Sequence, residues 1–327
     1  MIVVTGGAGF IGSNVVAALA ERGERVVVAD RLRMGEKWRN LAKHAIADFI
    51  FPSELPGFLD GAADEVRAVI HMGAISSTLE TNADLIVESN FKTSLQLWRW
   101  CALHQVRLIY ASSAATYGNG GQGFADNAEP EALAGLRPMN AYGWSKHAFD
   151  RSVIDMLRAG ERQPPQWAGL KFFNVYGPNE YHKGAMQSVV AKNYATAAAG
   201  GTVRLFKSHH PDYPDGGQLR DFVYVADCVD AILWLLEHPG TSGIFNLGTG
   251  QARSFEDIIR ALFDAAGRPP AIEYVDMPEA LRSTYQYFTQ ADMSRLRAAG
   301  WTRPPTSIEA GVRDYVTRFL AQEDRFR

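Results

Sequence analysis

A glycine-rich turn near the start of the chain limits its possible folds more than any other feature. Residues 2–30 read as a short β-branched strand, the turn, a helix with apolar periodicity and a second apolar strand. The turn carries Gly6, Gly9 and Gly12, which suit a tight bend, a close approach of backbone to a pyrophosphate, and helix–strand packing. The phosphates of a dinucleotide would lie at the helix N-terminus, where free N–H groups point toward them. We therefore interpret the stretch as a dinucleotide-binding unit and not as a purely structural turn.

The acidic residue at the end of the second strand bears on the choice of cofactor. Asp30 would accept hydrogen bonds from the hydroxyls of the adenosine ribose, which favours NAD. Arg31, Arg33 and Lys37 follow at once and could neutralise a 2′-phosphate, although they could also form a solvated basic loop. We expect NADP, with NAD as the alternative.

Strand and helix patterns alternate along all 327 residues, without repeats or low-complexity segments. This alternation predicts an α/β fold, a Rossmann-type doubly wound parallel sheet with a smaller C-terminal substrate-binding lobe. A hydrophobic content of 46% is sufficient for a sizeable core. We expect residues 1–172, together with 219–248, to form the dinucleotide-binding domain, and residues 173–327 to form mainly the substrate-binding domain.

Composition excludes several classes of partner. The net charge is −3 and there is no basic block, so nucleic acid is not expected to bind. No apolar run is long enough to cross a membrane, and no basic stretch precedes an apolar segment at the N-terminus. Cys101 and Cys228 lie in no metal-binding or disulfide spacing, so we expect no metal site and a cytoplasmic location.

The segment PMNAYGWSKHAFD, residues 138–150, places Tyr142 and Lys146 on one face of a predicted helix. A single pair of this spacing arises easily by chance. Its context decides the interpretation, because an apolar strand ends at Ser113 about 30 residues earlier. Ligands bind beyond the carboxyl ends of strands in open parallel sheets, so Ser113 is expected at the same site.

The glycine loop, the strand that ends in Ser113 and the Tyr142-x-x-x-Lys146 helix together resemble the extended branch of the short-chain dehydrogenase/reductase superfamily. The resemblance implies that Ser113 binds a substrate oxygen and that Tyr142 acts on the same oxygen as acid and base. It also implies that Lys146 binds the nicotinamide ribose and lowers the pKa of Tyr142. A free tyrosine titrates near 10, far above the working pH, so such help is required.

Segments of the second half narrow the resemblance. FNVYGPNEYHKGAMQSVV, RDFVYVADCVD, IFNLGTGQARSFEDI and YQYFTQADMSRLRAAGW resemble the ADP-L-glycero-D-manno-heptose 6-epimerase family. The resemblance implies inversion of C6 of an ADP-linked heptose by oxidation to a 6-ketone and re-reduction by a bound nicotinamide cofactor. It implies that Lys183 is a second acid/base group. The residues alone leave open a diphosphate-binding lysine or a solvated loop charge.

The same resemblance implies two sets of contact residues. Those for the cofactor are Gly6, Gly9, Phe10, Ile11, Gly12, Asp30, Arg31, Lys37, Met72, Gly73, Ala74, Ile75, Ser76, Asn90, Lys146 and Val175. Those for the substrate are Ser113, Asn174, Lys183, Ala185, Lys192, Phe206, Lys207, Ser208, His209, Arg220 and Tyr285. Arg220 is the expected diphosphate partner, and a surface salt bridge with Asp221 is its alternative.

The alternative function is another epimerase or dehydratase that acts on a nucleotide sugar. A dehydratase usually carries an acidic residue near the catalytic serine, whereas this chain has alanines and Thr116 there. A non-enzymatic redox sensor would typically lack the tyrosine or the lysine, and both are present. The resemblance further implies a homo-oligomer in lipopolysaccharide inner-core biosynthesis.

Overall fold

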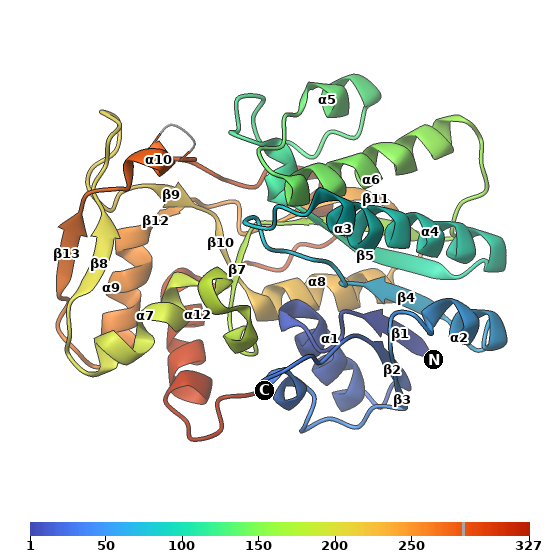
Figure 1. Cartoon of the computed structure of the whole chain (residues 1–327), viewed down its shortest axis with the longest axis horizontal. Helices are drawn as coiled ribbons and strands as arrows, with labels where there is room; N and C mark the ends of the chain where they lie inside the picture. Colours follow the sequence, from blue (N-terminus) through green and yellow to red (C-terminus); the bar gives the residue numbers. More distant parts are fainter. Residues whose placement is uncertain (283–284) are drawn as a thin grey trace.

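The computed structural model describes residues 1–282 and 285–327 (Figure 1). Its centre is a seven-stranded sheet in the order β11-β6-β5-β4-β1-β2-β3, in which every neighbouring pair is parallel. The strands are β1 (Ile2–Thr5), β2 (Val26–Ala29), β3 (Asp48–Ile50), β4 (Ala68–His71), β5 (Arg107–Ser113), β6 (Trp167–Phe172) and β11 (Gly243–Leu247). The strand order reverses between β1 and β4, so the predicted doubly wound parallel sheet is confirmed.

Helices cover both faces of this sheet, which explains why its strands are apolar along their whole length. On one face α1 (Phe10–Glu21) packs against α8 (Val225–Glu237). On the other lie α4 (Thr93–His104) and α6 (Ala141–Arg158), which both contact β5 (Figure 1). The other short helices of the first 172 residues are η1 (Lys37–Asn40), α2 (Leu55–Gly61), α3 (Ala83–Ile86), η2 (Val87–Lys92), η3 (Ala114–Tyr117) and α5 (Pro130–Gly135).

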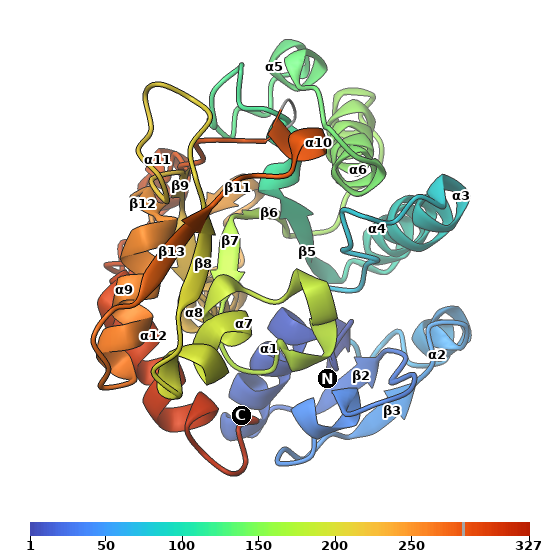
Figure 2. The same ribbon diagram turned by 60° about the vertical axis from the view of Figure 1, so that its left-hand side comes forward.

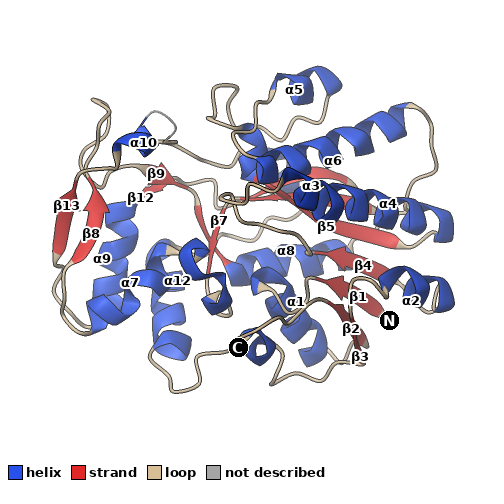
Figure 3. Cartoon of the chain, in the orientation of Figure 1, coloured by secondary structure: helices blue, strands red, loops and turns tan. Residues whose placement is uncertain are grey.

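A second group of elements packs around its own apolar core (Figures 2 and 3). Short strand pairs join β7 (Asn174–Tyr176) to β10 (Phe222–Tyr224), β9 (Leu219–Arg220) to β12 (Arg253–Ser254) and β8 (Val203–Phe206) to β13 (Ile272–Val275). Its helices are η4 (Tyr181–Met186), α7 (Val189–Ala198), α9 (Phe255–Ala265), α12 (Ile308–Tyr315) and η5 (Val316–Leu320). Two further short helices are α10 (Glu279–Arg282) and α11 (Ser294–Ala298), and α11 packs against β11 of the large sheet. Ser254 and Asp257 form a capping box at the start of α9.

The two cores suggest how the chain is divided. The core around the large sheet takes in β11 and also buried side chains from residues 291–301, far along the chain. The predicted boundary at residue 172 remains a proposal, since the chain crosses between the cores several times. No helix within the described residues is long and apolar enough to span a membrane.

Candidate active site

A cavity of about 1690 Å³ runs along the carboxyl ends of β1, β2, β4 and β5. It also reaches side chains of the second group of elements, so it lies where the two cores meet. The predicted residues that line it are Gly6, Gly9, Phe10, Ile11, Gly12, Asp30, Arg31, Lys37, Met72, Gly73, Ala74, Ile75, Ser76, Ser113, Tyr142, Lys146, Asn174, Val175 and Lys183.

The glycine loop forms the floor of one end of the cavity. Gly6 has a positive φ of 63°, and a Cβ atom there would lie 2.6 Å from the Cα of Gly73. A Cβ atom on Gly12 would lie 2.1 Å from the carbonyl oxygen of Gly6. Side chains at these positions would push the loop away from β4 and from α1. The N-terminus of α1 thus meets the cavity with unpaired N–H groups, which fits the phosphates of a dinucleotide.

Asp30 lies at the end of β2 and is held by three donors. Ala8 N donates to Oδ2 at 2.9 Å, Arg31 N donates to Oδ1 at 2.6 Å, and Lys37 Nζ pairs with Oδ1 at 2.7 Å. The charge of Lys37 is therefore balanced by Asp30. The Arg31 and Arg33 guanidinium groups have no carboxylate partner among the described residues, and both line the cavity, so both remain available to a 2′-phosphate.

Ser113, Tyr142 and Lys146 come together as the sequence predicts. Ser113 ends β5, and Tyr142 and Lys146 occupy successive turns of α6, whose start is capped by Asn140. The Ser113 hydroxyl lies close enough to the Tyr142 phenol to influence its ionisation. Lys146 is 2% exposed, and its burial lowers its pKa to about 8. The negative charge of Asp150 opposes this lowering.

The pKa of Tyr142 differs from the expectation. Burial raises the pKa of this phenol, and the neighbouring Ser113 hydroxyl opposes the rise. The expected lowering by Lys146 is not found, because burial and Ser113 are the influences on the pKa of this phenol. Ser113 therefore favours the ionised form of Tyr142, an effect separate from the substrate contact that the resemblance implies for it.

Lys183 reaches the same cavity from η4, in the segment that leads into α7 and lies beside α1 (Figure 2). Its ammonium lies 5.0 Å from the centre of the Phe10 ring. Burial lowers the pKa of Lys183, and Glu180 opposes this while Lys192 adds to it. A half-buried lysine with a lowered pKa is a better proton carrier than a solvated loop charge would be.

Asn90 does not line the cavity but supports its wall. It is fully buried in η2, where its Oδ1 accepts from Ile75 N at 2.8 Å and its Nδ2 donates to Ile75 O at 3.0 Å. Nδ2 also lies within hydrogen-bonding distance of Ser145 Oγ, at 3.1 Å. The residue therefore fixes the loop after β4 from behind.

The remaining predicted substrate residues lie outside the lining of this cavity, namely Ala185, Lys192, Phe206, Lys207, Ser208, His209, Arg220 and Tyr285. Arg220 is 8% exposed and lies between two rings, with its guanidinium carbon 5.4 Å from Tyr285 and 5.6 Å from Phe255. Tyr285 in turn contacts Phe206 edge to face, at 6.4 Å between ring centres. Arg220, Tyr285 and Phe206 therefore form one cluster.

The loop around residues 207–209 is held by other contacts. Lys207 Nζ lies 3.5 Å from an Asp276 carboxylate oxygen, Ser208 N donates to Asp215 Oδ1 at 2.7 Å, and His209 N donates to the Tyr287 hydroxyl at 3.2 Å.

The alternative role of Arg220, a salt bridge with Asp221, is not found in the described part of the chain. Asp221 instead accepts hydrogen bonds from the backbone N–H groups of Thr249, Gly250 and Ala291. Arg220 donates to the carbonyl of Leu219 and carries no carboxylate partner among the described residues. A buried guanidinium of this kind suits a phosphate group.

Several cavity residues were not predicted. Ala114 and Ala115 follow Ser113 directly, so their place at the end of a strand could have indicated them. Gln286 and Thr289 come from a distant segment and line the same cavity, with Gln286 Nε2 donating to the carbonyl of Gly118 at 2.8 Å. No local pattern in the sequence distinguishes these two residues.

Residues 2–248 match the model of the NAD dependent epimerase/dehydratase family. The chain belongs to this family. It is 48% identical, over 100% of both chains, to the ADP-L-glycero-D-manno-heptose-6-epimerase of Nitratidesulfovibrio vulgaris (strain DP4). The predicted resemblance to that group within the epimerase/dehydratase family is thereby confirmed.

Two solved structures of the epimerase/dehydratase type have closely similar folds. The ADP-L-glycero-D-manno-heptose-6-epimerase of Helicobacter pylori is 29% identical, with a TM-score of 0.77 over 97% of this chain and 95% of that one. The UDP-glucose 4-epimerase of Thermus thermophilus, solved in complex with NAD, is also 29% identical, with a TM-score of 0.74 over 96% and 97%. The chain is thus an epimerase-type isomerase that works with a nicotinamide cofactor.

Proposed function

We propose that this enzyme inverts the configuration at C6 of an ADP-linked heptose. One observation carries the proposal: Tyr142 and Lys183, two groups able to exchange a proton, face the same cavity as the glycine loop. The similarity to ADP-L-glycero-D-manno-heptose-6-epimerases supports the choice of substrate.

The chemistry of C6 explains the need for the cofactor. This carbon bears hydroxyl, hydrogen and carbon substituents with no adjacent carbonyl, so its hydrogen is not acidic enough for a protein base. A nicotinamide ring supplies the difficult step when bound, since it accepts a hydride from C6 and returns it. The glycine loop would hold the pyrophosphate, and Lys146 would hold the nicotinamide ribose.

The protein residues then have to remove the proton from the C6 oxygen during oxidation and return a proton to it during re-reduction. Ser113 binds this oxygen and favours the ionised form of Tyr142, which takes the hydroxyl proton as the ketone forms. The ketone turns to present its other face, which moves its oxygen away from Tyr142. Lys183 would deliver the proton to the oxygen in this second orientation. Arg220, clustered with Phe206 and Tyr285, would bind the diphosphate.

The first test concerns the substrate and the route of the C6 hydrogen. Incubation with one ADP-heptose epimer in D₂O is expected to yield the other epimer with no deuterium at C6, because the hydride returns without meeting water. Mass spectrometry and NMR of the product check this, and UDP-glucose serves as the control substrate. Deuterium at C6 would reject the hydride route. Conversion of UDP-glucose in place of the ADP-heptose would reject the proposed substrate.

The second test concerns the cofactor. The family description and the NAD-bound 4-epimerase favour NAD, whereas the available Arg31 supports the prediction of NADP. If NADP is the ligand, it should bind more tightly than NAD. Arg31→Ala should then weaken NADP binding by roughly tenfold to a hundredfold, the effect of losing a charge-assisted hydrogen bond. Isothermal titration with both dinucleotides measures this, and tighter binding of NAD to the native protein contradicts the prediction.

A further inference from the structure

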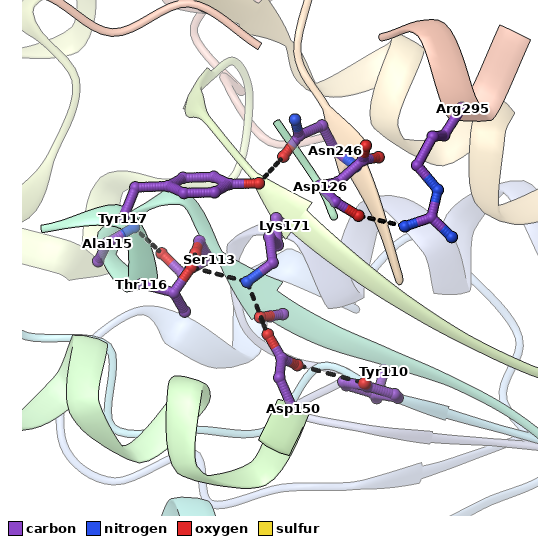
Figure 4. Close-up of polar contacts among 11 residues, drawn as sticks. Tyr110, Ser113, Ala115, Thr116, Tyr117, Asp126, Asp150, Lys171, Asn246 and Arg295 are labelled. Carbon is purple, nitrogen blue, oxygen red and sulfur yellow. Dashed lines mark hydrogen bonds and ion pairs between the residues drawn. The ribbon is translucent and has the colours of Figure 1, made fainter. Parts of the chain in front are cut away.

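A buried ion pair lies directly behind the catalytic residues. Lys171 Nζ on β6 is 2.8 Å from Asp150 Oδ2 on α6, and the side chains are 1% and 0% exposed. Removing two charges from water is costly unless further hydrogen bonds complete the arrangement. Here Asp150 also accepts from Ser112 Oγ at 2.7 Å. It accepts as well from the Tyr110 hydroxyl at 3.2 Å (Figure 4).

The pair is linked to Ser113 through one hydroxyl group. Lys171 Nζ donates to Thr116 Oγ1 at 2.7 Å, and Thr116 Oγ1 donates to the carbonyl of Ser113 at 2.8 Å. Ser113 Oγ accepts in turn from Ala115 N at 3.1 Å, which closes the turn η3 on itself (Figure 4). The hydroxyl of Thr116 therefore uses its one proton and one lone pair to join the lysine to the turn.

The same network also fixes the helix that carries the other two catalytic residues. Asp150 follows Tyr142 and Lys146 at intervals of four residues, so all three lie on one face of α6. Ser113 belongs to β5, which Asp150 contacts through the Ser112 hydroxyl. Lys171 on β6 therefore contacts both the turn after Ser113, through Thr116, and helix α6, through Asp150.

We propose that Lys171, Asp150 and Thr116 are positioning residues, which hold Ser113 and Tyr142 at the mutual distance that proton transfer requires. The inference rests on the proposed function and concerns the rate of the epimerisation. None of the three lines the cavity, so none is expected to contact substrate or cofactor. Misplacement of reacting groups by about 1 Å costs on the order of a hundredfold in rate, so a small movement of the turn suffices for a measurable effect.

Thr116 offers the cleanest test, because Thr116→Val removes only the hydroxyl and keeps the shape of a fully buried side chain. We expect kcat to fall by about tenfold to a hundredfold, with KM and the affinity for the dinucleotide nearly unchanged. Thr116→Ser retains the hydroxyl and should restore most of kcat. Hydrogen–deuterium exchange should become faster at residues 112–118 in the valine variant only.

A matched control separates positioning from stability. Thr306 Oγ1 donates to Asp227 Oδ1 at 2.7 Å, away from the cavity, so Thr306→Val also removes a threonine hydroxyl that donates a hydrogen bond, here to a carboxylate. It should lower Tm without lowering kcat. Should Thr116→Val fail to fold, the double variant Asp150→Asn/Lys171→Met removes both buried charges together and should show the same selective loss of kcat.

Failure of the inference can be distinguished from failure of the proposed function. Native protein that does not interconvert the ADP-heptose epimers rejects the function, and the inference is then judged by exchange at residues 112–118 alone. Unchanged exchange in Thr116→Val overturns the inference. With active native protein, a valine variant that keeps the native kcat, or a serine variant that loses as much as the valine variant, overturns it as well.

Discussion

Lys183→Met should nearly abolish epimerisation while leaving substrate affinity largely intact. Methionine has a stem of similar length that can still lie against the Phe10 ring, over which the Lys183 ammonium lies, but it cannot carry a proton. Without a proton donor for the second orientation of the ketone, re-reduction could occur only on the face from which the hydride left. We expect kcat for epimerisation to fall by at least about a hundredfold, the contribution of a general acid/base group.

Rates with each epimer and the dissociation constant of the substrate measure this effect. Lys92→Met is the matched control, because Lys92 is an exposed lysine that does not itself line the cavity. It should leave the rate unchanged. A lysine that only binds the diphosphate behaves differently, since its loss raises KM and spares kcat. That pattern in Lys183→Met would reject the second acid/base role and leave the hydride route intact.

Tyr142→Phe should lower kcat by on the order of 10²-fold or more, because it deletes the group that takes the proton from the C6 hydroxyl. The ring remains, so its packing and the start of α6 should be preserved. The dinucleotide is expected to stay bound, since the glycine loop and Lys146 are unaltered. Steady-state rates and titration with the dinucleotide measure the two effects separately.

Tyr274→Phe provides a control for loss of a phenolic hydroxyl, since Tyr274 lies on β13 away from the cavity lining. It should turn over at the native rate. Turnover of Tyr142→Phe at close to the native rate would remove Tyr142 from the mechanism. Loss of dinucleotide binding in the same variant would instead assign Tyr142 a role in holding the cofactor.

Local sequence was sufficient to predict the parts of the site that lie within single β-α units. The glycine loop is encoded by the spacing of Gly6, Gly9 and Gly12, because Gly9 and Gly12 must approach the backbone of Gly6 within the same unit. Tyr142 and Lys146 share a face of α6 because helical geometry requires it. Ser113 was predicted because it ends an apolar strand, and ligands bind beyond such strand ends in open parallel sheets. The doubly wound sheet followed from the alternation of strand and helix in the same way.

Only the tertiary structure decided which distant residues meet and how burial changes their chemistry. Lys183 is brought to Phe10 across more than half the chain, and Arg220 is enclosed by rings and not paired with Asp221. The pKa of Tyr142 rises where the sequence suggested a fall, since desolvation depends on packing from all sides. The Lys171–Asp150 pair was not predicted at all. A lysine inside an apolar strand has no local sign of its partner, because that partner lies on a neighbouring helix and the two meet only when helix and sheet pack together.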